Sequence, residues 1–384
     1  AIHLDYQRPD AYGALSMPVY HCAAFEFDNA AEMIESFCGR SDMPDYSRVT
    51  NPTVTYFERK VQALTGAEDV VAFGSGMAAI ANTLFCLASA GRTIVTSRHL
   101  FGNTLALVQD TMARFGVGLR FCDLTDTADV EAALDDTTCC IFMEVMTNPQ
   151  LEVADIAALS SLAHKHRLPL IADTTMVPFI VFDGKALGID VEVVSSTKYI
   201  SGGATSIGGL VILHAAESDF KRRMRQEMLM NFGAYMTPHV AYMQTLGLET
   251  LAVRYEKQTQ NALAMAEALQ HMPEVKAVRY PGLQTDAFHD VAVRQFGERP
   301  GAMLTLELES REACFRFLDR LQLICRATNL FDNRSLAIHP ASTIFGNFTE
   351  AQRRDMDISE HLIRLSAGLE DADDLIDDLR QALK

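Results

Sequence analysis

Seven short apolar runs alternate with helical patterns between residues 69 and 213, and this alternation constrains the fold more than any other feature. The runs are short, contain many β-branched residues and are bounded by polar or glycine-containing segments, which favours strands. Strand–helix alternation is typical of a mainly parallel sheet with helices on both faces, whose ligands bind beyond the carboxyl ends of the strands. The predicted strands are Val70–Phe73, Thr93–Thr96, Leu119–Phe121, Cys140–Met143, Pro169–Ala172, Glu192–Val194 and Leu210–Leu213.

The pattern changes at both ends of this region. The first residues are irregular and rich in Tyr, Pro and Phe, which predicts an N-terminal arm over residues 1–48. We expect a large α/β domain over residues 49–238 and a smaller α+β domain over residues 239–384. Helices are predicted over Phe101–Phe115, Ala154–His166, Ala241–Met272 and Asp371–Leu383, with further strands at Ala302–Leu308 and Ile363–Ser366.

Composition limits the functional class. The chain has 384 residues, 48% of them apolar, which is enough for a large core. Fifty acidic residues against 33 basic ones give a net charge of −17, which argues against nucleic-acid binding. The apolar runs are far shorter than a membrane span and no signal peptide opens the chain, so a cytoplasmic protein is expected. The eight cysteines are scattered without a C-x-x-C motif, which favours core thiols over disulfides or a metal site.

Lys198 carries the strongest chemical information. It follows the β-branched run that begins at Val191, comes directly after hydroxyl residues and precedes a glycine-rich stretch. A second apolar run, about 25 residues earlier, ends at Asp173. Pyridoxal 5′-phosphate chemistry needs a lysine for the Schiff base, hydroxyls for the phosphate and a carboxylate for the pyridinium nitrogen. Taken singly, Lys198 would more often be a surface lysine, and Asp173 a helix N-cap.

Other candidate residues have competing interpretations. Gly76 lies in a glycine–serine turn that opens a helix, so the turn either binds a phosphate at the helix N-terminus or is an ordinary capped turn. Arg364, within a short apolar strand, either forms a salt bridge or binds a substrate carboxylate. Asn148 belongs to a turn, and Tyr46 and Arg48 lie in the predicted arm, where a solvated loop is the simpler interpretation.

Taken in chain order, these segments resemble the Cys/Met-metabolism family of pyridoxal-phosphate enzymes, of fold type I, over nearly the whole chain. No single segment is decisive, but their number and order are. They are Tyr46-Ser47-Arg48 with Asn51-Pro52-Thr53, Ser75-Gly76-Met77, Glu144 with Thr147-Asn148-Pro149, Asp173-Thr174-Thr175, Ser195 with Thr197-Lys198-Tyr199, Gly247-Leu248-Glu249-Thr250-Leu251, His339-Pro340-Ala341 and Arg364-Leu365-Ser366 with Gly368-Leu369-Glu370.

The resemblance implies a pyridoxal 5′-phosphate site on a mainly parallel, seven-stranded sheet. Lys198 would carry the cofactor and shuttle protons, while Asp173 would pair with the pyridinium nitrogen. Tyr46 and Arg48 would reach the phosphate of a neighbouring subunit, so a homo-oligomer, in the family usually a dimer of dimers, is expected. The implied phosphate and ring contacts come from Gly76, Met77, Ser195, Thr197, Thr175 and Phe101, and the implied substrate contacts from Arg364, Asn148 and Asn329.

Three positions depart from the family pattern. Phe101 stands where the family has a cofactor-stacking tyrosine, so no phenol hydroxyl is present to protonate a leaving group. The proton would then come from Lys198, Tyr46 or water. Ile344-Phe345 replaces a usual Thr-His, and Phe331 replaces a usual glycine, which predicts a more apolar substrate rim.

Two stretches resemble the sulfhydrylase branch of the family. They are the segments 203–209 and 329–336, which are similar to the Gly-x-Thr-Ser-x-Gly-Gly and Asn-x-Gly-Asp-x-Arg-Thr-Leu patterns of homocysteine synthases. We therefore expect an O-acetylhomoserine sulfhydrylase-like γ-replacement that yields homocysteine, or methionine from methanethiol, and acetate. The alternatives are methionine γ-lyase, cystathionine γ-synthase or lyase, O-succinylhomoserine sulfhydrylase and a non-catalytic binding protein. The sequence leaves open whether the sulfur comes from sulfide, methanethiol or a sulfur-carrier protein.

Overall fold

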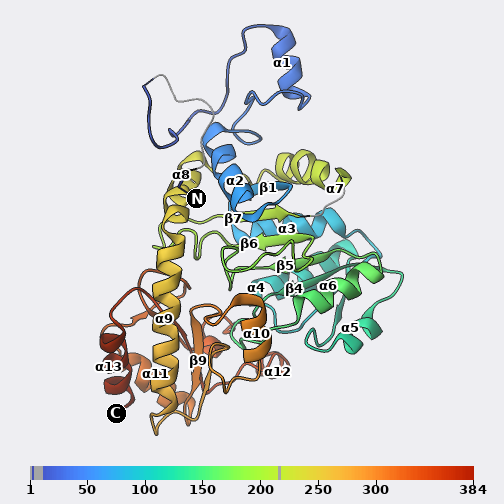
Figure 1. Cartoon of the computed structure of the whole chain (residues 1–384). Helices are drawn as coiled ribbons and strands as arrows, with labels where there is room; N and C mark the ends of the chain where they lie inside the picture. Colours follow the sequence, from blue (N-terminus) through green and yellow to red (C-terminus); the bar gives the residue numbers. More distant parts are fainter. Residues whose placement is uncertain (1, 4–11, 215–217) are drawn as a thin grey trace.

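A computed structural model describes residues 2–3, 12–214 and 218–384 of the chain (Figure 1). Residues 1 and 4–11 of the predicted arm, and residues 215–217 of the predicted large domain, lie outside the described residues. Between the arm and the C-terminus the chain forms two sheets, one of seven strands and one of five. The larger sheet occupies the middle of the view in Figure 1, and the smaller one lies toward the C-terminal end.

The seven-stranded sheet confirms the predicted fold class, and all seven predicted strands are present. The strand order is β1-β7-β6-β5-β4-β2-β3. Strands β6, β5, β4, β2 and β3 run parallel to one another, whereas β7 is antiparallel to both of its neighbours, β6 and β1. The bounds are Asp69–Phe73 for β1, Thr93–Thr96 for β2, Gly118–Phe121 for β3, Thr138–Glu144 for β4, Leu170–Asp173 for β5, Val191–Val194 for β6 and Gly209–Leu213 for β7.

Both faces of this sheet are apolar. Successive side chains of a strand point to opposite faces, and on β4 Ile141 and Met143 join one core cluster while Cys140 and Phe142 join another. Helices must therefore cover both faces, as in other parallel sheets. The first cluster includes side chains of α2 (Pro52–Thr65), α5 (Thr127–Ala133) and α6 (Ile156–Lys165). The second includes side chains of α3 (Gly76–Leu87), α4 (Gly102–Ala106) and η3 (Met224–Phe232).

Local capping chemistry fixes where several of these helices begin. Asn51 and Ser75 accept hydrogen bonds from backbone N–H groups in the first turns of α2 and α3, and Asp155 does the same for α6. The helix predicted over Phe101–Phe115 is only partly α-helical. After α4 the chain continues as a π-helical segment, η1 (Leu107–Thr111), and a 3-10 turn, η2 (Met112–Phe115), that ends at Gly116 with a φ of 78°.

The prediction of a single helix over Ala241–Met272 is wrong, because two helices meet at Thr250. They are α8 (Pro238–Glu249) and α9 (Leu251–Gln270), and the predicted domain boundary at residue 238 falls at the start of α8. The Arg254 side chain donates to the Gly247 carbonyl at 2.6 Å. A side chain rather than a continuing helix therefore binds this free carbonyl at the end of α8. Gly247 also packs against the Ile200 carbonyl so closely that a Cβ there would clash.

Helix α9 runs beside the five-stranded sheet, whose order is β10-β11-β12-β9-β8 (Figure 1). The predicted strands in this region are confirmed as β9 and β12, and the predicted final helix as α13. The strands in this region are Ala277–Arg279 for β8, Met303–Glu307 for β9, Cys325–Arg326 for β10, Leu336–Ile338 for β11 and Leu362–Ser366 for β12. The helices are His289–Phe296 for α10, Arg311–Arg320 for α11, Pro340–Ser342 for η4, Glu350–Asp355 for α12 and Ala372–Leu383 for α13. Earlier in the chain, α7 (Ser218–Arg223) precedes η3.

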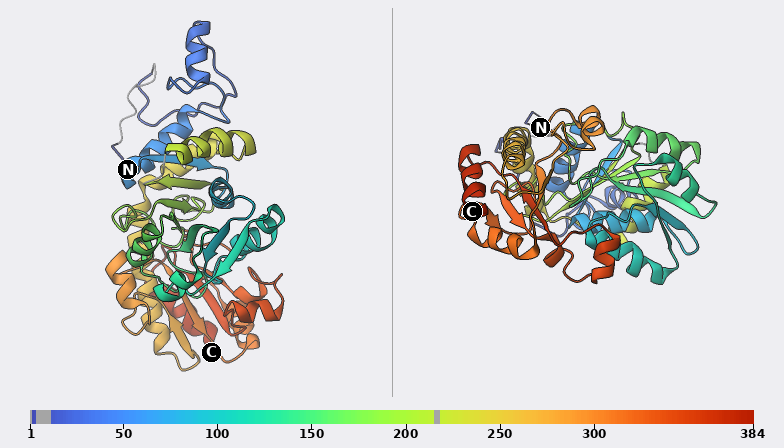
Figure 2. Two further views of the ribbon diagram at one scale, coloured as in Figure 1. Left: turned by 90° about the vertical axis from the view of Figure 1, so that its right-hand side faces the viewer. Right: turned by 90° about the horizontal axis from the view of Figure 1, so that it is seen from below.

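The N-terminal arm is not wholly irregular, which corrects the prediction. It contains helix α1 (Ala30–Phe37), which begins where the Asn29 side chain accepts from the Glu32 N–H at 3.0 Å. The helix projects from the end of the molecule opposite the smaller sheet (Figures 1 and 2) and exposes Met33, Ile34 and Phe37. In the described part of the chain, no helix is long and apolar enough to cross a membrane.

The prediction of core thiols holds for most of the cysteines but not for all. Cys86, Cys122, Cys139, Cys140 and Cys314 are buried, whereas Cys22, Cys38 and Cys325 are exposed. Two of the exposed thiols belong to the arm, where little of the rest of the chain covers them. All eight are free in the described structure.

Candidate active site

Lys198 lies in the turn after β6, at the carboxyl ends of the parallel strands. Its Nζ donates to the Asn329 Oδ1 at 3.1 Å, which joins this turn to the segment between β10 and β11. Burial, and then the nearby Arg364 charge, lower the pKa of Lys198 to about 8. A substantial fraction of the amine is therefore neutral near pH 8, as a nucleophilic lysine requires.

Asp173 ends β5, directly beside β6. Its carboxylate accepts from the Thr175 N–H at 2.9 Å, and the Thr175 hydroxyl in turn accepts from the Ser195 N–H at 2.8 Å. Burial raises the pKa of Asp173 to about 6. The three predicted residues Asp173, Thr175 and Ser195 therefore lie together at two adjacent strand ends, and within the described part of the chain no cation pairs with the carboxylate.

The glycine turn before α3 packs against the same strand ends. A Cβ at Gly76 would lie 2.6 Å from the Ser195 Cβ, so only glycine allows this approach. Ser75 caps α3 by accepting from the Ala78 N–H at 3.1 Å, and the first N–H groups of the helix therefore begin beside Ser195. The turn is thus both a capped turn and a helix N-terminus suited to an anion.

The other two residues predicted to contact the phosphate, Met77 and Thr197, already have hydrogen-bond partners within the chain. Met77 follows Gly76, and its sulfur accepts from the Thr104 hydroxyl at 3.9 Å. The Thr197 hydroxyl is already engaged by both backbone groups of Gly208, with distances of 3.0 Å from the N–H and 3.2 Å to the carbonyl. A phosphate bound by the Thr197 hydroxyl would therefore share that hydroxyl with Gly208. The phosphate contact of Thr197 remains a prediction.

Phe101 is held at the same sheet edge by a carboxylate. Its N–H donates to the Glu144 Oε1 at 2.6 Å, and Glu144 is in register with Asp173 on the neighbouring strand. Burial, and then the charge of Asp173, raise the pKa of Glu144 well above its usual range. The predicted ring-stacking position is thus anchored to the strand that adjoins Asp173.

Arg364 is a buried cation without a carboxylate partner among the described residues. It projects from β12 with 3% exposure, and burial lowers its pKa to about 10. Its Nη1 donates to the Asn148 Oδ1 and its Nη2 to the Asn329 carbonyl, both at 3.1 Å, while Nε has no partner in the described structure. The salt-bridge interpretation fails, and the remaining donor capacity fits a carboxylate ligand.

Tyr46 and Arg48 lie in the projecting arm and not beside Lys198. Tyr46 is 45% exposed, and the Arg48 guanidinium lies 5.6 Å from its ring centroid. Arg48 also donates to the Met230 carbonyl. Among the contacts of the described residues, none joins either side chain to the Lys198 group, so within one chain they do not complete this site.

The predicted apolar substrate rim is wrong at two positions. Phe331 and Phe345 are both fully buried, because each packs into a core cluster. The Phe331 ring lies 6.0 Å from the Tyr199 ring and 6.2 Å from the Tyr255 ring. Its φ of 53° is left-handed, which agrees with the glycine that the family has there.

Two residues of the site region were assigned no role from the sequence. Asp332 accepts from the Asn329 Nδ2 at 3.2 Å, and Arg254 donates to the Tyr199 carbonyl at 2.9 Å, next to Lys198. Asp332 lies within the motif at residues 329–336, so this motif could have identified Asp332 from the sequence. Arg254 lies on an ordinary helical pattern, and nothing in the sequence sets it apart.

Comparisons with known proteins agree with this geometry. The model of the family described as Cys/Met metabolism PLP-dependent enzyme matches residues 1–384. An L-methionine gamma-lyase of Pseudomonas putida is 38% identical over 386 residues, covering 100% of this chain and 96% of that protein. An O-succinylhomoserine sulfhydrylase of Pseudomonas aeruginosa is 35% identical over 378 residues, covering 98% of this chain and 93% of that protein.

A solved structure is also similar to this chain over nearly its whole length. It is a Campylobacter jejuni protein described as an O-acetylhomoserine (thiol)-lyase, with a pyridoxyl-lysine phosphate, and it superposes with a TM-score of 0.94. The sequences are 33% identical, and the match covers 98% of this chain and 97% of the other. The fold and the site together define a fold type I pyridoxal-phosphate enzyme. The chain belongs to the Cys/Met metabolism PLP-dependent enzyme family.

The residues present fit pyridoxal 5′-phosphate, the cofactor of the family. Gly76 opens the approach to a helix N-terminus, Lys198 is a buried amine with a lowered pKa, and Asp173 is a buried carboxylate that no cation of the described residues neutralises. These are the three groups that a phosphate, an aldehyde carbon and a pyridinium nitrogen require.

Proposed function

We propose that the chain catalyses the γ-elimination of L-methionine, with water, to 2-oxobutyrate, methanethiol and ammonia. The observation that carries this proposal is the end-to-end likeness to L-methionine gamma-lyases, of which the Pseudomonas putida enzyme covers 100% of this chain. The family supports the coarser statement, that the enzyme performs pyridoxal-phosphate-dependent elimination or replacement in Cys/Met metabolism.

The proposed roles follow from the geometry of the site. Arg364, oriented by Asn148 and the Asn329 carbonyl, binds the substrate α-carboxylate through its free donor capacity. Lys198, whose pKa is about 8, takes the proton from Cα and returns it later in the reaction. Asp173 keeps the ring nitrogen protonated. When bound, pyridoxal 5′-phosphate supplies the electron-withdrawing system that stabilises the negative charge developed at Cα.

The leaving group decides between the two candidate reactions. Methanethiolate is a poorer leaving group than acetate, so methionine needs more acid assistance than an ester does. Phe101 has no hydroxyl to give that assistance, and its N–H is already bound to Glu144 at 2.6 Å. This observation favours a second candidate, the γ-replacement of a homoserine ester by a sulfur nucleophile, which the sequence motifs at 203–209 and 329–336 also predict.

One set of assays separates the candidates. Purified enzyme is incubated with L-methionine alone, with O-acetylhomoserine plus sulfide and with O-succinylhomoserine plus sulfide, and 2-oxobutyrate and homocysteine are both measured. Rapid 2-oxobutyrate formation from methionine supports the lyase. Rapid homocysteine formation from an ester, with little turnover of methionine, overturns the lyase proposal and identifies the preferred acyl group. A Lys198→Ala variant is the control for enzyme-dependent turnover.

A further inference from the structure

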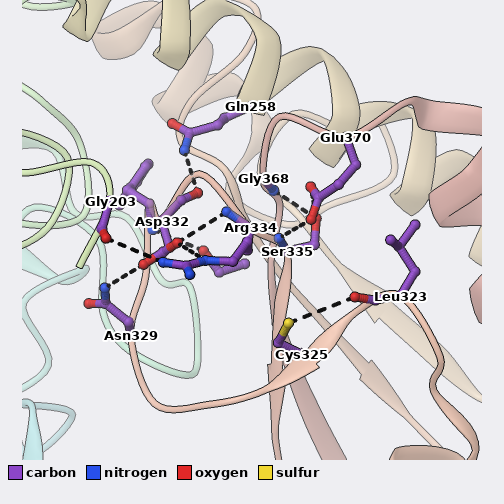
Figure 3. A network of polar contacts seen from close by, with 12 residues as sticks. Gly203, Gln258, Leu323, Cys325, Asn329, Asp332, Arg334, Ser335, Gly368 and Glu370 are labelled. Carbon is purple, nitrogen blue, oxygen red and sulfur yellow. Dashed lines mark hydrogen bonds and ion pairs between the residues drawn. The ribbon is translucent and has the colours of Figure 1, made fainter. Parts of the chain in front are cut away.

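The Asn329 side chain bridges Lys198 and a buried carboxylate. Its Oδ1 accepts from the Lys198 Nζ at 3.1 Å. Its Nδ2 donates to the Asp332 Oδ2 at 3.2 Å (Figure 3). An amide has one acceptor end and one donor end, so each end can serve only one of these two partners. The contact with Asp332 therefore decides which end of the amide faces the lysine.

Asp332 is itself held rigidly. It is 2% exposed, and its Oδ1 accepts from the Arg334 Nε at 2.9 Å and from the Arg334 N–H at 3.1 Å. Its backbone carbonyl accepts from the Gln258 Nε2 at 2.9 Å, and Arg334 also donates to the Gly203 carbonyl at 3.3 Å (Figure 3). The carboxylate thus has one oxygen for Arg334 and one for Asn329, and neither oxygen can turn away without losing a hydrogen bond.

We propose that Asp332 is a positioning residue for Lys198: it fixes the Asn329 amide so that the amide oxygen receives the lysine amine whenever that amine is not bonded to the cofactor. The proposal rests on the assignment of Lys198 as the cofactor lysine. If Asp332 were absent, the amide could turn its Nδ2 toward Lys198, and a donor would then face an ammonium group.

The charges around the amine give the proposal a measurable consequence. Arg364 lies on β12 and lowers the pKa of Lys198 together with burial, while Asp332 and Arg334 form an ion pair beyond Asn329. The Asn329 oxygen opposes the effect of Arg364, because it stabilises the protonated amine. Loss of the fixed amide orientation should therefore lower the pH at which Lys198 becomes a nucleophile.

The test follows cofactor capture rather than turnover. The full-length chain is freed of cofactor, pyridoxal 5′-phosphate is added across a pH series, and the rate at which the absorbance of the lysine-bound cofactor appears is plotted against pH. In Asp332→Asn we expect the midpoint of this profile to fall by at least about half a pH unit. In Asp377→Asn, which makes the same change to an exposed Asp–Arg pair on α13, we expect no shift.

Two further variants separate orientation from simple loss of charge. Asp332→Glu keeps the charge but moves the carboxylate, so it should lower the midpoint as Asp332→Asn does, and it also serves if Asp332→Asn does not fold. In an Asn329→Ala background, Asp332→Asn should cause no further shift. An equal shift in that background, or an unchanged midpoint in Asp332→Glu, would overturn the proposal. Persistence of the absorbance in Lys198→Ala would instead refute the assignment of the lysine.

Discussion

Glu144 and Asp173 end two neighbouring parallel strands in direct register, so that two buried carboxyl groups stand side by side at the edge of the sheet. The first accepts from the Phe101 N–H and the second from the Thr175 N–H. Burial raises the pKa of both groups, and their mutual repulsion adds to the shift at Glu144. This edge of the sheet therefore favours a cation, and the pyridinium ring of the cofactor supplies one beside Asp173.

Replacing Asp173 by Asn should stabilise the cofactor-free chain while weakening cofactor binding. The pKa of Asp173 is raised from 3.8 to about 6, so its favourable contribution is complete below pH 3.8 and is lost as the pH rises through about 6. At pH 8 the variant should gain up to roughly 3 kcal/mol over the native chain, and less at pH 5. Urea unfolding at both pH values measures this, with Asp377→Asn as control. A variant less stable at pH 8 would contradict it.

Arg364→Lys should weaken substrate binding more than it slows turnover. Lysine keeps a positive charge but cannot form the paired N–H contacts of a guanidinium, and it would leave the Asn148 oxygen and the Asn329 carbonyl less well bound. We expect KM for the amino-acid substrate to rise by about 10-fold or more, with a smaller change in kcat. Arg316→Lys, at an exposed position of α11, is the matched control. An unchanged KM would show that Arg364 does not bind the carboxylate.

The strands of the larger sheet could be predicted from the sequence, because each strand is short, largely apolar and bounded by polar residues. The placement of Asp173 and Lys198 at one edge of the sheet could also be predicted, since Asp173 ends β5, Lys198 lies in the turn after β6, and carboxyl ends of parallel strands meet at one edge. The alternatives at Arg364 could not be resolved, because only the fold shows that no described carboxylate reaches it.

The failures have a common physical cause, which is contact between segments far apart in the chain. At the break between α8 and α9, Arg254 donates to the Tyr199 carbonyl and Gly247 approaches the Ile200 carbonyl closely. The burial of Phe331 depends on the rings of Tyr199 and Tyr255. None of these partners is within reach in the sequence, so helical periodicity and residue type alone predicted a continuous helix and an exposed rim.

Phe101→Tyr should accelerate the elimination of methionine selectively. A phenol at this position would add an acid near the leaving group, and general acid catalysis typically contributes about 100-fold or more. We expect kcat for 2-oxobutyrate formation from methionine to rise by about 10-fold or more, while turnover of a homoserine ester changes little, since acetate needs less assistance. Phe101→Leu, which removes the ring, is the control and should impair both reactions. Equal acceleration of both reactions by Phe101→Tyr would contradict this role.

His99→Gln should weaken, in a pH-dependent way, the contact of the segment after β2 with the segment after α12. His99 Nδ1 lies 2.6 Å from Glu152 and Nε2 lies 3.0 Å from Asp357. Burial alone would lower the pKa of His99, but the hydrogen bonds and charges of these two carboxylates outweigh it and raise the pKa. The stabilisation is complete below the ordinary histidine pKa and is lost as the pH rises through the raised value.

We therefore expect the His99→Gln variant to lose about 1–2 kcal/mol of unfolding free energy at pH 6 and clearly less at pH 9. Urea unfolding at the two pH values measures the difference. His361→Gln is the matched control, because that imidazole lies outside this carboxylate pair. A loss of equal size at both pH values would mean that His99 acts only through packing.

Tyr46 and Arg48 should complete the active site of a neighbouring subunit. They lie in the arm, Tyr46 is 45% exposed, and no contact among the described residues joins either side chain to the Lys198 group of their own chain. We expect Lys198→Ala and Tyr46→Phe/Arg48→Ala each to be nearly inactive alone. After the two are mixed, unfolded and refolded together, activity should recover to about a quarter of the native value, because a heterodimer contains one intact site. A mixture of Lys198→Ala with a chain carrying all three changes should stay inactive. No recovery in the first mixture would place both residues outside the shared site.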